Sequence, residues 1–371
     1  MSQYIKKQNT SFFTNRLIEC FFILGFTLLT YRYNIYIAFG ILPIFFIWRQ
    51  RIYIGVSYIA ILLLLLPILY YAYDGANAAF RVIKTMVVLL PIYYTNFLER
   101  TNYRLSDIFR WFMKINALLV CIDFVLYFTI GRTIMSFTES GFMPRPCGLL
   151  EDSNFFSYLM LVTIFYYRWR DGKYTKLFIL SLLLSGSFSA ISFFCFLLFV
   201  YKFIKTTPKC TLPFRIFIIS TTILIISTYD WIAIHPNEIL SLISKLDIND
   251  LIKVKIASMT HRFNTVSNAM MEIDTVEEVL MGIGAGKTRE LSDIGLNLHN
   301  SFLQMFLEMG AVLSSVVLSA LLYMVYRIRQ TRYVILFCTI LILSSIMETF
   351  YNPLLSFVYY ISFLDHNERI L

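Results

Sequence analysis

Apolar runs long enough to cross a bilayer follow one another along most of the chain, with short polar segments between them. A run of roughly 17–25 apolar residues predicts a membrane-spanning helix, because a helix satisfies its own backbone hydrogen bonds within the hydrocarbon layer. The pattern predicts twelve helices, near residues 17–31, 34–48, 52–72, 79–97, 111–130, 154–168, 176–186, 187–204, 213–230, 300–326, 333–347 and 351–364. The predicted fold class is therefore an all-α integral membrane protein, with residues 1–371 forming a single polytopic membrane domain.

The pair 176–186 and 187–204 is the least defined part of this pattern. The stretch between the two apolar runs, "LLLSGSFSA", fits a tight turn between two helices. It equally fits a break within one long helix, and the sequence leaves both interpretations open.

Charge predicts how the helices are oriented. Five short segments are all basic: "WRQR", "ERTNYR", "RWRDGKYTK", "KFIKTTPKC" and "YRIRQTR". One of them follows every second predicted helix, so all five lie on the same side of the membrane. Lys and Arg accumulate in cytoplasmic loops, so this pattern predicts that these loops and both termini are cytoplasmic. The same rule accounts for the net charge of +9, which therefore does not indicate nucleic-acid binding.

Two segments on the opposite, outer side stand out. Residues 131–153 form the first, and residues 231–298 form the second, which is too long for a simple connector. Within the second, apolar residues recur at helical spacing and predict a helix that lies on the membrane surface or covers a cavity. These residues are Phe263, Val266, Ala269, Met270 and Ile273.

The stretch "MGIGAGKT" resembles a phosphate-binding loop at first sight. That loop requires a glycine five residues before the Gly-Lys pair, where this chain has Met281. The loop also falls on the predicted outer side, where ATP is scarce. Gly282, Gly284 and Gly286 are better explained as positions where the backbone turns in ways that side chains would block. The six cysteines show no spacing typical of metal ligands, so no metal site is predicted.

The next segment, "LHNSFLQMFLEMG", predicts the start of a helix with a polar stripe. Ser301 and Gln304 fit a Ser-x-x-Gln capping box, which places His299 just before the helix at the outer surface. Asn300, Gln304 and Glu308 then follow at intervals of four along one helix face. This stripe either binds a neighbouring helix or lines a polar cavity in which His299 transfers a proton.

Cationic residues are predicted near the same outer face. Arg81 and Lys84 lie on one side of the fourth helix, and Arg145 and Arg262 lie in the two outer segments. Guanidinium groups bind phosphate through two hydrogen bonds, so this set suits a phosphate headgroup at a lipid surface. The alternative is solvated loop charges for Arg145 and Arg262, and for Arg81 an ion pair with Asp74 or Asp123.

These segments, in this order, resemble the bacterial O-antigen polymerase and O-antigen ligase superfamily. Arg145 and Gly148 match the family's Arg-x-x-Gly, and Asn154 follows, although Ser153 stands where the family commonly has proline. The chain has Phe188 where many members carry the arginine of Gly-Ser-Arg. The family's Gly-x-Gly, His-Asn-x-x-Leu and Glu-x-Gly elements are matched by Gly284, Gly286, His299, Asn300, Leu303, Glu308 and Gly310.

The resemblance implies a GT-C-like glycosyltransferase in the bacterial inner membrane, with its active site at the periplasmic face. It implies a donor glycan linked to undecaprenyl diphosphate, with no metal, no cofactor and no nucleotide sugar. His299 would be the catalytic base, and Arg145, Arg262, Arg81 and Lys84 would bind the diphosphate. Asn300, Gln304, Glu308, Gly284 and Gly286 would support the site. A flippase and a chain-length regulator are expected partners, besides membrane lipid.

Polymerisation of lipid-linked repeat units is the favoured activity, because the match is fragmentary and polymerases diverge widely. A ligase that transfers the glycan to lipid A core shares the donor and the pocket, and it remains an alternative. A polysaccharide or lipid transporter without chemistry is the alternative from another class, although the chain has no internal repeat of the kind that many transporters show.

Overall fold

The computed structural model describes residues 55–89, 105–135, 137–140, 143–150, 152–171, 175–204, 211–235, 260, 263–292, 298, 300–328 and 330–346. The predicted helices near 17–31, 34–48 and 351–364 lie outside these residues. The described part is helical, apart from one short two-stranded sheet.

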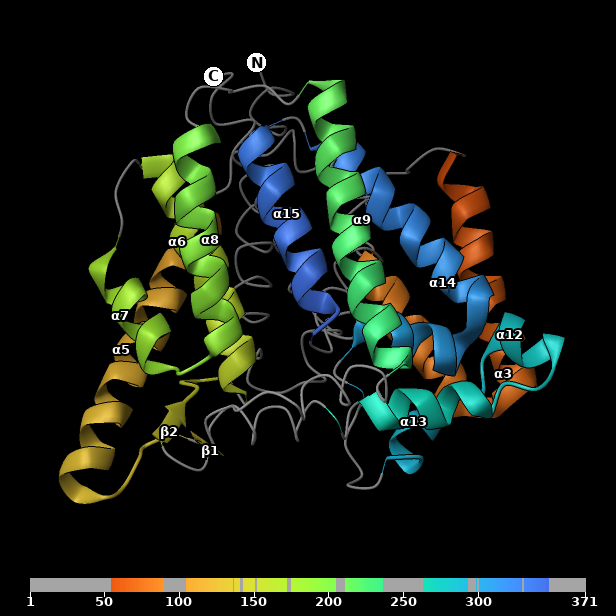
Figure 1. The fold of residues 1–371 in the computed structure, drawn as a ribbon, viewed down its shortest axis with the longest axis horizontal. Coiled ribbons are helices and arrows are strands. Elements are labelled where there is room, and N and C mark those ends of the chain that lie inside the picture. Colours follow the sequence, from red (N-terminus) through yellow and green to blue (C-terminus); the bar gives the residue numbers. More distant parts are fainter. Residues whose placement is uncertain are drawn as a thin grey trace, which may run out of the picture.

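Most of the described helices follow the predicted ranges closely. The described helices are α3 (Gly55–Leu89), α5 (Leu105–Ile130), α6 (Ser153–Asp171), α7 (Lys176–Leu184), α8 (Phe188–Ile204), α9 (Leu212–Ile234), α12 (Val276–Met281), α13 (Lys287–Glu290), α14 (Ser301–Arg327) and α15 (Thr331–Ser344), of which α12 and α13 were not among the twelve predicted (Figure 1). Helix α3 joins the predicted helix at 52–72 to the start of the next. Helices α7 and α8 are separate elements with a turn between them, which favours the first interpretation of "LLLSGSFSA" over a break within one long helix.

Three of the described helices are long and apolar enough to cross a membrane. They comprise Arg110–Ile130 of α5, all of α9 and all of α14. Helix α9 also exposes many large apolar side chains, which include Phe214, Phe217, Ile223, Leu224 and Trp231. An exposed apolar area of this extent suits contact with lipid rather than with water. The transmembrane character is thus supported, and the full set of twelve spans stays a prediction.

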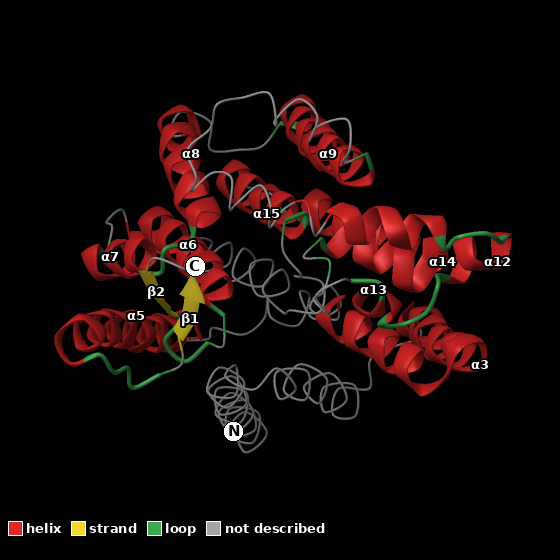
Figure 2. Ribbon diagram, turned by 60° about the horizontal axis from the view of Figure 1, so that its bottom comes forward, coloured by secondary structure: helices red, strands yellow, loops and turns green. Residues whose placement is uncertain are grey.

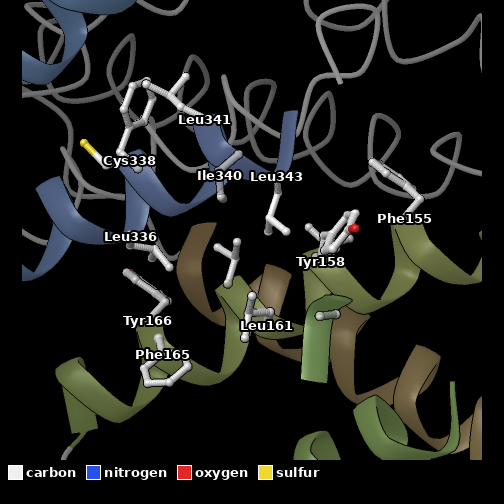
Figure 3. Close-up of a cluster of buried hydrophobic side chains, with 14 of the residues drawn as sticks. Phe155, Tyr158, Leu161, Phe165, Tyr166, Leu336, Cys338, Ile340, Leu341 and Leu343 are labelled. Atoms are coloured by element: carbon white, nitrogen blue, oxygen red, sulfur yellow. The ribbon is translucent and has the colours of Figure 1, made fainter. Parts of the chain in front are cut away.

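Helix α6 lies at the centre of the apolar core. Its residues from Phe155 to Tyr167 are all buried, as expected for a helix surrounded by others. Figure 3 shows Tyr158 and Tyr166 of α6 on the side that faces α15, whereas Phe165 points away from α15 and packs on Phe194 of α8. The labelled side chains of α15 are Leu336, Cys338, Ile340, Leu341 and Leu343.

The first outer segment contains a β-hairpin, which an all-α fold did not predict. Strands β1 (Phe137–Ser140) and β2 (Met143–Pro146) pair in antiparallel register, with Ser140 opposite Met143. Only Gly141 and Phe142 separate the strands in the sequence, and a two-residue connection that begins with glycine is typical of hairpins. The hairpin and the α12–α13 region lie at the same end of the molecule, on opposite sides of it (Figures 1 and 2).

The helix predicted within the second outer segment is confirmed. Residues 263–271 are helical, and Phe263, Val266 and Ala269 are buried. They pack with Ala233 of α9 and with Leu303 of α14 in a second, smaller apolar cluster. The helical spacing of apolar residues therefore identified the face that packs against the helix bundle.

Candidate functional site

Two of the described helices are interrupted at the same junction. Helix α14 has a non-helical residue at Gly310 (φ 68°), and α3 has two, at Asp74 and Gly75 (φ −135° and 78°). A break within a membrane helix leaves backbone groups that need partners from the surrounding protein. The segment that supplies partners at both breaks is the loop between α12 and α13, residues 282–286, which we call the glycine loop.

The glycine loop meets the break in α14 backbone to backbone. A Cβ atom at Gly282 would collide with the Glu308 carbonyl, and one at Gly310 would collide with the Leu280 carbonyl. Both residues have positive φ, so glycine is required there for space and for conformation. The Ile283 N–H donates to the Leu307 carbonyl at 2.8 Å, which satisfies one carbonyl next to the break.

Side chains of α3 hold the same contact from the other side. The Tyr73 hydroxyl donates to the Gly282 carbonyl at 2.9 Å, and the Tyr70 hydroxyl donates to the Met309 carbonyl. At the break in α3, Asp74 Oδ2 accepts from the Ala285 N–H at 2.7 Å. The junction thus joins segments about 210 residues apart in the chain.

Glu308 is the buried centre of this junction. Its carboxylate forms an ion pair with Arg81 of α3 and accepts a hydrogen bond from Thr288 of α13. Gln304 Nε2 approaches the same carboxylate at 3.4 Å. A Cβ atom at Gly286 would lie 3.5 Å from Arg81 Nη2, so the glycine loop runs directly beside the guanidinium. A buried carboxylate requires such compensation by charge and hydrogen bonds.

The acidic partner of Arg81 is neither of the two residues, Asp74 and Asp123, that the sequence offered as alternatives. Asp74 faces the glycine loop at the break in α3, as described above. Asp123 accepts hydrogen bonds from the Ile134 and Met135 N–H groups, at 2.7 and 3.3 Å, in the segment that follows α5. Each carboxylate therefore satisfies nearby backbone N–H groups, whereas Glu308 pairs with Arg81.

The start of α14 is capped by Asn300, and the predicted capping box at Ser301 is wrong. Asn300 Oδ1 accepts from the Phe302 and Leu303 N–H groups, both at 3.1 Å. The Asn300 amide then donates to Asp230 Oδ1 of α9 at 2.7 Å. Gln304 does not serve as a box residue, because its amide approaches Glu308. The predicted polar stripe of Asn300, Gln304 and Glu308 is buried throughout.

Arg145 lies in a second polar group, formed by β2, the start of α6 and the turn between α7 and α8. Its Nε donates to the Ser185 carbonyl at 3.2 Å, and its Nη2 donates to Asn154 Oδ1 at 2.6 Å. Burial lowers the pKa of Arg145, and the nearby Asp152 carboxylate acts in the opposite direction. The guanidinium stays charged at neutral pH, because its ordinary pKa is so high.

The cations grouped by the sequence are therefore divided between two places. Strand β2, which carries Arg145, and α3, which carries Arg81 and Lys84, lie on opposite sides of the molecule in both views (Figures 1 and 2). Lys84 Nζ lies 4.6 Å from the centroid of the Phe80 ring. His299 and Arg262 lie outside the described residues, so their convergence with Arg145 stays a prediction.

Several polar residues of the junction were not selected from the sequence. Asp230 interrupts the apolar run "STYDWIAI", and Thr288 lies in the glycine-rich stretch that resembled a nucleotide site. An acidic residue within a span is an available signal, because such residues need a partner in the membrane. No such signal marks Tyr70 and Tyr73, since tyrosine is common in this chain.

The chain matches no protein-family model, no characterised protein and no solved structure.

Proposed function

We propose that the protein is a membrane glycosyltransferase that polymerises a surface polysaccharide, of the O-antigen type, from repeat units linked to undecaprenyl diphosphate. One observation carries the proposal: Gly284, Gly286, Glu308 and Gly310, which matched separate motif elements of the family, pack into one buried junction with Arg81. The two motif elements lie in different parts of the fold, the glycine loop and α14, and they are in direct contact.

In the proposed reaction, a sugar hydroxyl of one lipid-linked repeat unit attacks the anomeric carbon of the glycan on another. The new bond joins the hydroxyl oxygen to the anomeric carbon, and the bond from that carbon to the diphosphate oxygen breaks. His299 takes the hydroxyl proton, and undecaprenyl diphosphate leaves with the electron pair. A direct displacement of this kind inverts the anomeric configuration. A positioned base typically contributes about 10²–10⁴-fold to the rate.

The cations have different tasks in this proposal. Arg145 and Arg262 neutralise the charge that develops on the departing diphosphate, and such stabilisation is worth roughly 3–4 kcal/mol per donor. Arg81 is paired with Glu308 and lies against Gly286, so its main task is to hold the glycine loop. Asn300 fixes the start of α14, directly after His299 in the chain.

Elongation by the purified protein tests the proposal. The protein is reconstituted in liposomes with undecaprenyl-diphosphate-linked repeat units and nothing else, and the products are separated by chain length. We expect a ladder of longer glycans. His299→Ala should reduce its formation by about 10²-fold or more. Arg145→Lys should also reduce it strongly, because lysine keeps the charge but lacks the fork.

Arg132→Lys is the matched control, because Arg132 is an exposed arginine of the same outer segment. It should elongate at the wild-type rate. Full elongation by His299→Ala would disprove the assignment of the base. Equal elongation rates for Arg145→Lys and Arg132→Lys would disprove that the Arg145 guanidinium binds the diphosphate through two hydrogen bonds.

The broken helices also suit a transporter, since transporters commonly bind substrate where helices are interrupted. The breaks in α3 and α14 are the specific observation in favour of this second candidate. The same liposomes separate the two functions. Movement of the lipid-linked unit across the bilayer without any lengthening of the glycan would favour a transporter.

A further inference from the structure

We propose that Asn154 is a positioning residue, which orients the Arg145 guanidinium so that its free N–H groups bind the diphosphate of the lipid-linked donor. This inference rests on the proposed function and adds a residue with a defined task to it. It comes from the way in which the second polar group holds its arginine.

The guanidinium of Arg145 is held along one edge only. An arginine side chain has five N–H donors. In Arg145 one donor, on Nε, is bound to the Ser185 carbonyl and a second, on Nη2, is bound to Asn154 Oδ1. The other three make no hydrogen bond to any residue in the described ranges. Two fixed contacts thus set the plane of the guanidinium and leave a fork of N–H groups for a ligand.

Asn154 is itself held firmly in place. Its N–H donates to Asp152 Oδ1 at 2.7 Å in the first turn of α6. Its Oδ1 accepts a second hydrogen bond, from the Ser187 hydroxyl, at 3.1 Å. The turn that carries Ser185 is also hydrogen-bonded to α6, because Ser185 Oγ lies 2.6 Å from Ser157 Oγ. The acceptor is therefore preorganised, and a preorganised group loses little entropy when a ligand binds.

Asn154 is uncharged, and this decides how it affects Arg145. An amide oxygen accepts a hydrogen bond from the guanidinium without cancelling its positive charge. Arg81 shows the opposite arrangement, because its partner Glu308 is a carboxylate. Asp152 is close enough to raise the pKa of Arg145 but forms no ion pair with it among the described residues, whereas Glu308 is paired directly with Arg81. Partial burial of Arg145 strengthens its attraction for phosphate, because the surroundings screen charge less than water does.

Binding of undecaprenyl diphosphate, without any glycan, tests the inference. The full chain is placed in phosphatidylcholine nanodiscs, and affinity is measured for wild type, Asn154→Ala, Arg145→Ala and the double variant. We expect Asn154→Ala to weaken binding about tenfold, the effect of losing one hydrogen bond to a charged group. The double variant should bind no more weakly than Arg145→Ala alone, because Asn154 acts only through Arg145.

Two further variants complete the design. Asn154→Asp keeps the acceptor oxygen but adds a negative charge, and we expect it to bind at least as weakly as Asn154→Ala. Thr163→Ala is the matched control, because it removes a side-chain hydrogen bond of α6, to the Leu159 carbonyl, that involves neither Arg145 nor Asn154. It should bind like wild type. If Asn154→Ala does not fold, Asn154→Ser takes its place in the same cycle.

The outcomes separate this inference from the proposed function. Wild-type affinity in Asn154→Ala, or a double variant that binds more weakly than Arg145→Ala, would overturn the positioning role alone. An affinity in Asn154→Asp equal to that of wild type would do the same, since it would show that the charge of Arg145 is irrelevant. If the wild type does not bind undecaprenyl diphosphate, the proposed function fails together with the inference.

Discussion

Gly282 and Gly310 show most directly how single residues determine the site. Each has a positive φ, and the Cα atom of each lies against the backbone of the other segment, where there is no room for a Cβ atom. The glycine loop and the break in α14 therefore exist as a pair, and a change in either one should affect both.

Gly310→Ala tests this pairing. We expect a loss of about 3 kcal/mol or more in unfolding free energy, from the positive φ together with the collision at Leu280. Thermal unfolding in detergent measures the effect. Gly131→Ala is the control, because Gly131 also has a positive φ, but open space surrounds its Cα. It should lose only about 1–2 kcal/mol, and an equal loss in both variants would contradict the steric explanation.

At this scale the sequence predicted which residues matter better than it predicted their contacts. The glycines were identified correctly as positions of unusual backbone, because only glycine adopts such conformations readily. Arg81 was predicted to bind a diphosphate, with an ion pair to Asp74 or Asp123 as the alternative, and in the structure it pairs with Glu308. Contacts between residues 227 positions apart depend on the packing of whole helices, which no local pattern specifies.

At the scale of elements, the contact between α3 and α14 depends on the Arg81–Glu308 pair. Glu308 is fully buried, whereas the Arg81 side chain is 23% exposed. A buried ion pair adds little over apolar packing, but removal of one partner leaves an uncompensated charge. The pair therefore specifies how the two helices meet, and it does so more than it stabilises them.

Arg81→Met tests this role. We expect a loss of about 3 kcal/mol, because Glu308 is left buried without its cation. The double variant Arg81→Met/Glu308→Gln should recover part of this loss, since no charge then stays buried. Thermal unfolding of both variants and of Glu308→Gln completes the cycle. A double variant less stable than either single variant would contradict the interpretation.

Helix starts show where local sequence rules succeed and where they fail. The Ser-x-x-Gln pattern at Ser301 is not a capping box, whereas Thr275 and Glu278 form one at the start of α12. There the Asp274 and Thr275 N–H groups and the Thr275 hydroxyl bind the Glu278 carboxylate and lower its pKa. The difference lies in the third residue, since Glu278 is free to turn back, whereas Gln304 is engaged by a buried neighbour.

At the scale of the whole molecule, the hairpin and the α12–α13 region share one end of the bundle (Figure 1). The charge pattern predicts that this end is the non-cytoplasmic one. The two polar groups, around Arg145 and around Arg81, then lie toward the same compartment on different sides of the bundle. In the proposed reaction, the group around Arg145 binds the donor diphosphate, whereas the buried Arg81–Glu308 pair holds the glycine loop at the same end.

Labelling of single cysteines tests this orientation. Arg132→Cys and Val276→Cys introduce exposed thiols at the end of α5 and in α12, in a chain without its own cysteines. We expect a membrane-impermeant maleimide to label both in intact spheroplasts. Lys202→Cys, in the last turn of α8, should react only after lysis. Labelling of Lys202→Cys in intact spheroplasts would contradict the predicted topology.

The membrane class and the helix ranges were predictable because apolar run length and spacing are local properties of the sequence. The hairpin was missed because two strands of four residues give a weak signal beside long apolar helices. The separation of Arg145 from Arg81 was also missed, because a shared distance from the membrane surface says nothing about position around the bundle.

The interruption in α3 has a consequence for how the protein is made. Residues 74 and 81 leave the ribosome about 200 residues before their partners at 285 and 308. Until those partners are made, Asp74 and Arg81 lack the contacts that the finished junction gives them. The last third of the chain thus supplies the partners that complete a helix from its first third.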